Sequence, residues 1–269
     1  MRPSLVALDL DGTLLTTDCR LPMGHALAVQ ALRRMGATVV IATGRPLLTT
    51  RWVQRDLGLD APLICFNGGW VGHPDRTPIA AHGLAEGEVH EVIAVLAGGS
   101  GAICCYPDAD TWIMDREIAH TRYWRDLYQA PIAIHDDLRS AWRGPSLKMM
   151  YVVEPAHLPA TQQRLAERFG ERFHVVASQD DRLEIMPRCI TKAWGLRHLA
   201  EHLGIAREDV WAVGDAENDR EMVQWAGHGC IMGQASDSLR SLARHILPGI
   251  DARGLCALPG LLARHLADG

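Results

Sequence analysis

The sequence of 269 residues lacks an excess of positive charge. It has 27 lysines and arginines against 32 aspartates and glutamates, which gives a formal net charge of -5. A chain with this balance has no basic surface field to attract nucleic acid or an anionic membrane. We therefore expect neither as a partner, and an anionic ligand would have to be bound by a few local groups.

Other absences bear on location and cofactor. No uninterrupted apolar run reaches the length of a membrane-spanning helix, and the short N-terminal apolar stretch is broken by acids, unlike a signal peptide. None of the seven cysteines has the CxxC spacing of a zinc or redox site, so reduced thiols are favoured. No GxGxxG follows the first predicted strand, which disfavours a dinucleotide-binding dehydrogenase. We expect a cytoplasmic protein.

Both ends of the chain show apolar runs that alternate with helical patterns. Predicted strands cover residues 5–8, 37–42, 62–66, 210–213 and 229–232, and predicted helices cover 26–35, 49–57, 192–203, 220–226 and a final one over 239–243. Strand and helix alternation at this spacing is the signature of a doubly wound parallel sheet. The fold class expected is α/β, with a Rossmann-like parallel-sheet core.

The middle of the chain has a different character. Predicted strands (102–106, 111–114, 147–153 and 183–186) and helices (86–96 and 159–169) are mixed there with Gly, Pro and Asp turns. This pattern indicates an α+β insertion with a sheet of its own. We predict a core domain formed by residues 1–81 and 189–269, and an inserted domain over 82–188.

Polar groups follow the predicted strands, where open α/β sheets bind ligands. Asp9 and Asp11 come directly after the first strand and lean to one side of an extended backbone, which suits a cation and a proton-transfer role. Thr43, Gly44 and Arg45 follow the second strand and could hold phosphate oxygens. Each group also has a simpler interpretation, because such residues often only form a turn or end a strand.

Two later segments carry similar residues. Lys192 directly precedes a predicted helix, where a lone lysine is usually a solvated charge. Asp215, Asn218 and Asp219 lie in an acidic loop after a strand, where Asn218 or Asp219 could simply cap the next helix. Alone, each signal is ambiguous, but their order along the chain is not.

Taken together, these motifs resemble those of the haloacid dehalogenase superfamily, and within it the Cof-like sugar-phosphatase branch. The matching segments are DLDGTLL at 9–15, ATGR at 42–45, NGG at 67–69, EIMP at 184–187 with the following Lys192, and GDAENDREM at 214–222. The resemblance covers nearly the whole chain. It implies a Rossmann-like core and a large α+β cap, inserted between the second and third motifs, that closes over the substrate.

The resemblance also implies roles in phosphoryl transfer. Asp9 would be the nucleophile that forms a phospho-aspartate, and Asp11 would protonate the leaving alkoxide and then activate water. Thr43 and Lys192 would bind the transferring phosphoryl group. Family members that dehalogenate lack an acid at the position of Asp11, so its presence favours phosphatase or phosphomutase chemistry.

The implied cofactor is Mg²⁺. Asp215 would bind it together with the Asp9 carboxylate and the backbone carbonyl of Asp11, while Asn218 and Asp219 would lie just outside these ligands or against the phosphate. Magnesium fits such a site because it takes few protein carboxylates and keeps waters and phosphate oxygens as ligands.

The expected activity is therefore Mg²⁺-dependent hydrolysis of a small phosphorylated metabolite, with sugar phosphates favoured by the resemblance. Two alternatives stay open: a phosphomutase of the same superfamily, and a phosphometabolite-binding regulator with little turnover, against which the intact acids and Lys192 argue. Two residues depart from the pattern: Cys189 replaces a more usual glycine, and Gln234 replaces a frequent asparagine.

Several other side chains have residue types that occur in functional sites. His198 and His202 have helical metal-pair spacing but not the zinc-protease order, so an exposed helix face is favoured. Core packing is the preferred role of three tryptophans in the insertion, and two charged residues near its end could reach the substrate. The tryptophans are Trp112, Trp124 and Trp142, and the charged residues are Arg182 and Glu184.

Overall fold

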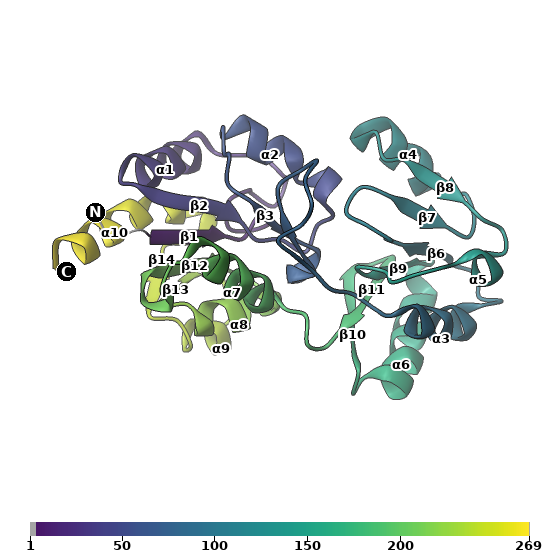
Figure 1. Ribbon diagram of the computed structural model, residues 1–269. Helices are drawn as coiled ribbons and strands as arrows, with labels where there is room; N and C mark the ends of the chain where they lie inside the picture. The colour runs from purple at the N-terminus through teal and green to yellow at the C-terminus, as the bar shows by residue number, and fades with distance from the viewer. Residues whose placement is uncertain (1–3, 269) are drawn as a thin grey trace. The chain divides into compact units, whose positions relative to one another are not determined.

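The structure is a computed structural model that describes residues 4–268, so residues 1–3 and 269 of the predicted core domain lie outside the described part. The described chain forms two compact units (Figure 1). Residues 4–45, 50–80 and 191–268 form the first, called here the core unit. Residues 46–49 and 81–190 form the second, called here the inserted unit.

The core unit is built on a five-stranded sheet in which every described strand pair is parallel. The strand order is β14-β13-β12-β1-β2. Every residue of β1 is buried, as expected for an apolar strand covered on both faces. The strands are β1 (Ser4–Leu8), β2 (Ala37–Ile41), β12 (Val210–Gly214), β13 (His228–Met232) and β14 (His245–Leu247). The predicted α/β class with a parallel core sheet is confirmed.

Helices cover both faces of this sheet (Figure 1). Helices α1 (Met23–Arg34) and α10 (Leu258–Asp268) lie on one face, and α7 (Lys192–Leu203), α8 (Arg220–Trp225) and α9 (Asp237–Arg240) lie on the other. Helix α2 (Arg51–Asp56) follows β2. The N-cap of α7 is Thr191, whose side chain accepts a hydrogen bond from the backbone N–H of Trp194 at 3.3 Å, and this cap fixes the position of Lys192.

The core unit differs from the sequence prediction at two places. The strand expected over 62–66 exists as β3 (Leu63–Cys65), but it joins the parallel sheet only through a bridge between Ala42 and Ile64. Its main partner is the antiparallel β4 (Trp70–Gly72), in a separate sheet with β5 (Ala80–Ala81), because the turn at Phe66–Gly68 reverses the chain. The prediction also missed β14 and α10, so the helix expected over 239–243 is not the last one.

The inserted unit has a mixed six-stranded sheet in the order β10-β11-β9-β6-β7-β8. Its strands are β6 (Ala102–Cys105), β7 (Trp112–Met114), β8 (Ile132–Ile134), β9 (Met149–Val152), β10 (Phe173–Gln179) and β11 (Arg182–Pro187). Its helices are α3 (Glu86–Leu96), α4 (Ala119–Tyr128), α5 (Leu138–Ala141) and α6 (Leu158–Phe169). The α+β character is confirmed, although α4, α5, β8 and β10 were not predicted.

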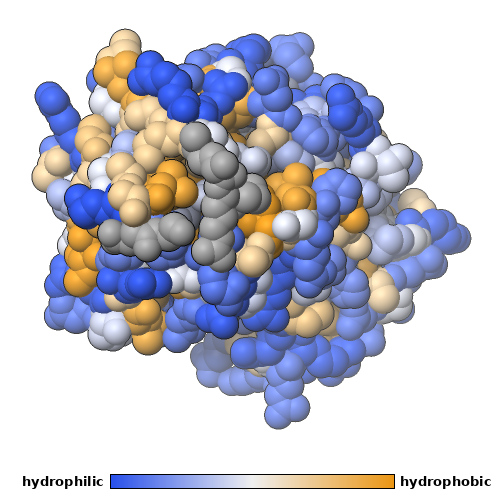
Figure 2. Space-filling model, turned by 60° about the vertical axis from the view of Figure 1, so that its left-hand side comes forward, coloured by the Kyte–Doolittle hydropathy of each residue, from blue (hydrophilic) through white to orange (hydrophobic). Residues whose placement is uncertain are grey.

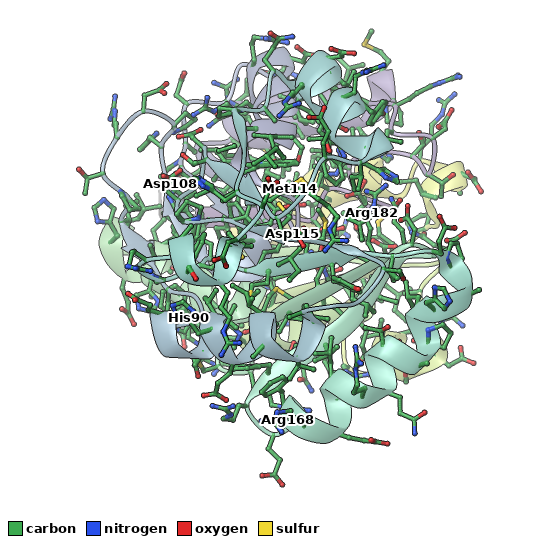
Figure 3. All side chains as sticks on the ribbon, turned by 90° about the vertical axis from the view of Figure 1, so that its right-hand side faces the viewer. His90, Asp108, Met114, Asp115, Arg168 and Arg182 are labelled. Atoms are coloured by element: carbon green, nitrogen blue, oxygen red, sulfur yellow. The ribbon has the colours of Figure 1, made fainter. Side chains whose placement is uncertain are left out.

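Each unit has its own apolar core. In the inserted unit, α3 and α6 pack against one face of the sheet, and in Figure 3 His90 and Arg168 mark these helices while Met114, Asp115 and Arg182 lie at the sheet. The three tryptophans are buried, which confirms core packing as their role. Within residues 4–268 no helix is both long and apolar enough to cross a membrane.

The surface of the core unit mixes charged and apolar side chains. Figure 2 shows the face around the chain ends, where small apolar groups alternate with charged ones. The large exposed apolar residues of this unit include Met23, Leu27 and Ile246. Scattered apolar side chains of this kind are normal on protein surfaces and do not by themselves mark an interface.

Candidate active site

The candidate site lies at the carboxyl edge of the parallel sheet. Asp9 follows β1, Thr43 follows β2 and Asp215 follows β12, and these three strands are neighbours in the sheet. The backbone N–H of Asp9 donates to the carbonyl of Val213 at 2.9 Å, so pairing between strands continues up to the site. Because parallel strands end at the same edge, residues far apart in the sequence meet there.

Lys192 links two of the acids. Its ammonium group donates to Asp9 Oδ1 at 2.5 Å and to Asp219 Oδ1 at 2.6 Å, and all three side chains are buried. The other carboxylate oxygen of Asp219 accepts the backbone N–H groups of Asp215 and Ala216, both at 3.0 Å. Asp219 therefore anchors Lys192 and the acidic loop, and its oxygens are occupied by protein donors.

Around Lys192 there are more carboxylates than ammonium groups. One oxygen of each of Asp9, Asp215 and Asp219 lies within 4.8 Å of the others, and Lys192 is the ammonium group among them. Burial and the charge of Asp219 raise the pKa of Asp9 despite Lys192, and the same two causes raise the pKa of Asp215. Burial alone would lower the pKa of Lys192, but the carboxylates of Asp219 and Asp9 raise it.

This surplus of negative charge fits a divalent cation. Three carboxylates and one ammonium leave two negative charges uncompensated in a buried place, where isolated charges are costly. Because both oxygens of Asp219 accept hydrogen bonds from Lys192 or from backbone N–H groups, Asp9 and Asp215 are the carboxylates better placed to bind a cation. Oxygen ligands of this type suit Mg²⁺.

Gly12 and Thr13 fix the loop after β1 against Asp215. Gly12 has a φ of +82°, and a Cβ there would lie 2.3 Å from Asp215 Oδ2, so only glycine permits this approach. The buried Thr13 hydroxyl donates to Asp215 Oδ1 at 2.9 Å. Thr13 was not predicted as a site residue, although it belongs to the DLDGTLL motif.

Asp11 does not join the acidic cluster through its side chain. The Asp11 side chain binds the guanidinium of Arg45 instead. Arg45 Nε donates to Asp11 Oδ2 at 2.8 Å, and a second nitrogen donates to Oδ1. Half of the Asp11 side chain is exposed, in contrast to the buried Asp9. Arg45 was predicted as a phosphate ligand, but in the structure its side chain binds Asp11, the candidate acid and base.

The remaining predicted residues surround Thr43. The Thr43 hydroxyl accepts the backbone N–H of Arg45 at 3.1 Å, which closes the turn that contains Gly44. The side chain of Asn67 packs against Gly44, and its Oδ1 accepts a hydrogen bond from Asn218 Nδ2 at 2.9 Å. Asn67 belongs to the NGG motif but was not predicted as a site residue.

The two departures from the motif pattern fall in different units. Gln234 donates to the carbonyl of Gly12 at 2.7 Å and accepts the N–H of Ile250 at 2.9 Å, so it braces the loop after β1. Its amide also helps to lower the pKa of Asp215 against the raising effect of burial. Cys189 belongs to the inserted unit and is exposed, with its sulfur 4.0 Å from His82 Nε2.

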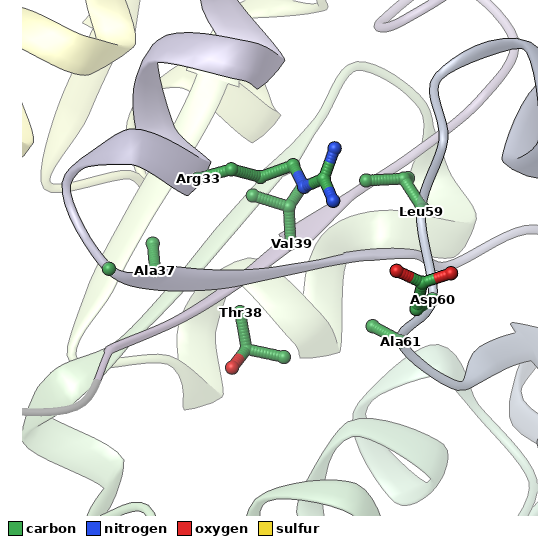
Figure 4. Close-up of a pocket in the computed structure, with 8 residues that line it drawn as sticks. Arg33, Ala37, Thr38, Val39, Leu59, Asp60 and Ala61 are labelled. Carbon is green, nitrogen blue, oxygen red and sulfur yellow. The ribbon is translucent and has the colours of Figure 1, made fainter.

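The remaining candidates from the sequence contact residues of their own unit. The ring of His198 lies 3.9 Å from that of Trp194 and next to its carbonyl, a contact within α7. In the inserted unit, Glu184 accepts from Lys148 at 2.7 Å and Arg182 contacts Asp181. A cavity of about 220 Å³ lies at the amino end of β2, at the sheet edge opposite to the candidate site. Arg33 and Asp60 are among the residues that line it (Figure 4).

The fold and the site define a Rossmann-like α/β enzyme with an acidic centre at the carboxyl edge of its sheet. The chain belongs to the haloacid dehalogenase-like hydrolase family, whose sequence profile matches residues 6–257. An HMP-PP phosphatase from Cronobacter sakazakii is 31% identical over 246 residues, which cover 90% of this chain and 88% of that protein. An HMP-PP phosphatase from Escherichia coli is 32% identical over 253 residues, with the same two coverages.

Solved structures share the whole fold. A haloacid dehalogenase-like hydrolase from Bacteroides thetaiotaomicron superimposes with a TM-score of 0.83 at 24% identity, covering 97% of this chain and 100% of that chain. A sugar phosphatase of subclass IIB of the same superfamily gives 0.78 at 19% identity, with 97% and 99% covered. The family resemblance inferred from the motifs is confirmed.

Proposed function

We propose that this chain is a Mg²⁺-dependent phosphatase that hydrolyses small phosphomonoesters through an aspartyl-phosphate on Asp9. The observation that carries the proposal is the buried contact of Asp9 with Lys192 at 2.5 Å, beside Asp215. This contact orients the Asp9 carboxylate and places the positive charge of the Lys192 ammonium group beside it. Relatives over 30% identical are named as phosphatases, which supports the same reaction class here.

In the first step, an oxygen of Asp9 attacks phosphorus in line and the bond from phosphorus to the ester oxygen breaks. Asp11 gives its proton to the leaving alkoxide. In the second step, Asp11 takes a proton from water, the water oxygen attacks phosphorus, and the bond to Asp9 breaks to release phosphate. Lys192 holds Asp9 in place and offsets the charge of the transferring group.

The Mg²⁺ would be held by Asp9 and Asp215, with the backbone carbonyl of Asp11 as a further ligand. When bound, it lowers the repulsion between the anionic nucleophile and the anionic phosphate. Thr13 and Gln234 would keep Asp215 and the loop after β1 in register for this role, because both side chains already bond to these groups.

We propose that residues 82–188 act as a cap that selects the substrate. The sheet and helices of this segment form a unit with a separate core, which can vary without changing the core unit. Sugar phosphates are the proposed class, since a sugar phosphatase shares the fold. The name of the Cronobacter relative makes HMP-PP a second compound to test.

The nucleophile is tested by Asp9→Asn. We expect release of phosphate from p-nitrophenyl phosphate to depend on Mg²⁺, to stop with EDTA, and to fall by at least about 1,000-fold in the variant, because an amide cannot form the acyl phosphate. Asp56→Asn, which removes an exposed carboxylate of α2, is the matched control and should keep full activity. Undiminished turnover by Asp9→Asn would refute the assignment.

The substrate is tested by phosphate release from a panel of sugar phosphates, nucleotides and HMP-PP. A sugar phosphate with the highest kcat/KM supports the proposed class. Incubation of a sugar 1-phosphate, followed by separation of the products, distinguishes hydrolysis from phosphomutase activity, since a mutase returns the phosphoryl group to the sugar.

A further inference from the structure

We infer that Asn67 is a positioning residue for the phosphate-binding loops, acting through Asn218 and the Thr43–Arg45 turn. This inference rests on the proposed phosphatase function, since the motif resemblance places Thr43 and Asn218 at the phosphate only if the chain has that function. The residue itself needs no contact with the substrate. It joins loops that follow two different strands of the sheet.

The backbone at Asn67 has an uncommon conformation. Phe66 and Asn67 both have a φ of +53°, and Gly68 has a φ of +98°, so three successive residues lie in the left-handed region. For residues other than glycine this conformation costs of the order of 1–3 kcal/mol each, and surrounding contacts must maintain it. Phe66 is fully buried and Asn67 is 8% exposed, so the turn is held inside the core unit.

Two backbone hydrogen bonds join this turn to the loop after β2. The N–H of Phe66 donates to the carbonyl of Arg45 at 3.1 Å, and the N–H of Asn67 donates to the carbonyl of Thr43 at 3.0 Å. The turn also abuts the start of α7, because a Cβ on Gly68 would lie 2.1 Å from the carbonyl oxygen of Thr191. The turn therefore touches the segments that carry Thr43 and Lys192.

The side chain of Asn67 adds the third connection. A Cβ on Gly44 would lie 2.9 Å from Asn67 Oδ1 and 3.0 Å from Nδ2, so the amide packs directly on the Gly44 backbone. The same Oδ1 accepts the hydrogen bond from Asn218, 151 residues later in the sequence. One amide group thus sets the spacing between the loops after β2 and β12.

Asparagine rather than glycine at position 67 indicates a role beyond forming the turn. Glycine would adopt the left-handed conformation without strain, whereas asparagine only tolerates it. A turn needed for the fold alone would be served better by glycine. The amide is therefore explained by what it holds, namely the side chain of Asn218 and the backbone of Gly44.

The test is Asn67→Gly, which keeps the backbone conformation and removes the amide. We expect a melting temperature within a few degrees of the wild type, because the backbone strain that glycine relieves offsets part of the lost packing and of the added entropy of the unfolded chain. We expect kcat/KM for p-nitrophenyl phosphate to fall about 5–20-fold, the size associated with loss of one good hydrogen bond, with a matching weakening of inhibition by inorganic phosphate. Asp75→Gly is the matched control, since Asp75 has a φ of +62° and is exposed; it should leave both unchanged.

A double-mutant cycle then shows whether Asn67 acts through Asn218. Asn218→Ala alone should lower kcat/KM, and Asn67→Gly should cause a smaller loss in that background than in the wild type, because the bond is already gone and only the contact with Gly44 is left to lose. Losses that multiply, or an Asn67→Gly variant equal to the wild type in kcat/KM and in phosphate inhibition, would overturn the inference. If the wild type releases no phosphate from any ester, the proposed function fails, and calorimetric binding of inorganic phosphate to the same variants decides the inference alone.

Discussion

At the residue scale, the contact between Arg45 and Asp11 links two side chains to which the sequence assigned separate roles. The guanidinium forms a two-pronged hydrogen bond with the carboxylate, a geometry that arginine offers and lysine does not. Burial alone would lower the pKa of Arg45, but its bonds to Asp11 raise it, so the guanidinium stays charged. We interpret Arg45 as the group that holds Asp11 in position, and one of its two bonds must open for Asp11 to give or take a proton in the proposed reaction.

Arg45→Lys is expected to lower kcat about tenfold or more with little change in KM. The charge is kept, but the forked bond to Asp11, which belongs to the stronger class of charged hydrogen bonds, is lost. Steady-state kinetics with p-nitrophenyl phosphate and with an alkyl phosphate measure the effect, and Arg55→Lys on the exposed face of α2 serves as the control. If Arg45 instead bound the phosphate directly, KM would rise and kcat would be kept.

The sequence predicted the acids of the candidate site but not all of the residues that position its loops. Asp9, Lys192 and Asp215 were found because each follows or precedes a recognisable element in a known motif, and the structure brings all three together. Asn67 and Thr13 were missed because their importance lies in side-chain bonds to residues 151 and 202 positions away. Both residues lie in motifs that the sequence shows, but a motif does not state which distant side chain each of its residues contacts.

At the element scale, prediction succeeded where helix and strand boundaries have local causes. The bounds of α7 agree with the prediction because Thr191 caps its start and Gly204 ends it. The prediction that β3 belongs to the parallel sheet was wrong, because the apolar pattern of a strand does not indicate its partner. The left-handed turn after Cys65 reverses the chain, so β3 pairs with β4. The short edge strand β14 and helix α10 have weak local signals and are stabilised by packing.

Packing around β14 brings together a stack of aromatic rings. The ring of His228 in β13 lies 4.1 Å from Trp211 and 5.9 Å from His245, nearly parallel to both, and 4.2 Å from His265 of α10. Burial first, and then the charges of His265, Arg244 and His245, lower the pKa of His228 to about 4. Burial likewise lowers the pKa of His245.

We expect this stack to destabilise the core unit in mild acid. A histidine whose pKa is lower in the folded state binds protons better when unfolded, so stability is lost as the pH falls from about 6.5 toward 4. The loss from His228 is about 3 kcal/mol by pH 4. Urea unfolding at pH 7 and pH 4.5 should show a smaller loss in His228→Phe, which keeps an aromatic ring without the titrating group.

His135→Phe is the control for this measurement, because His135 is exposed in the inserted unit. It should retain the full acid-dependent loss of the wild type. An equal loss in His228→Phe and the wild type would show that other groups cause the acid sensitivity.

At the scale of the whole molecule, the proposed catalytic residues all belong to the core unit. Asp9, Thr43, Lys192 and Asp215 come from sequence segments on both sides of the inserted unit. A chain with two separate apolar cores need not unfold as one cooperative system. Mg²⁺ that binds at the acidic cluster should therefore stabilise one unit more than the other.

Hydrogen exchange followed by mass spectrometry measures this difference directly. A ligand that binds only the folded state adds about 2.7 kcal/mol of stability at 100 times its Kd, and here it also relieves the repulsion between Asp9 and Asp215. After removal of metal with EDTA, added Mg²⁺ should slow exchange in β1 and β12 and leave β6 and β9 nearly unchanged. Asp215→Asn should abolish the slowing in β1 and β12. If exchange slowed equally in both units, they would unfold together, and the inserted unit would share the stability of the metal site despite having its own core.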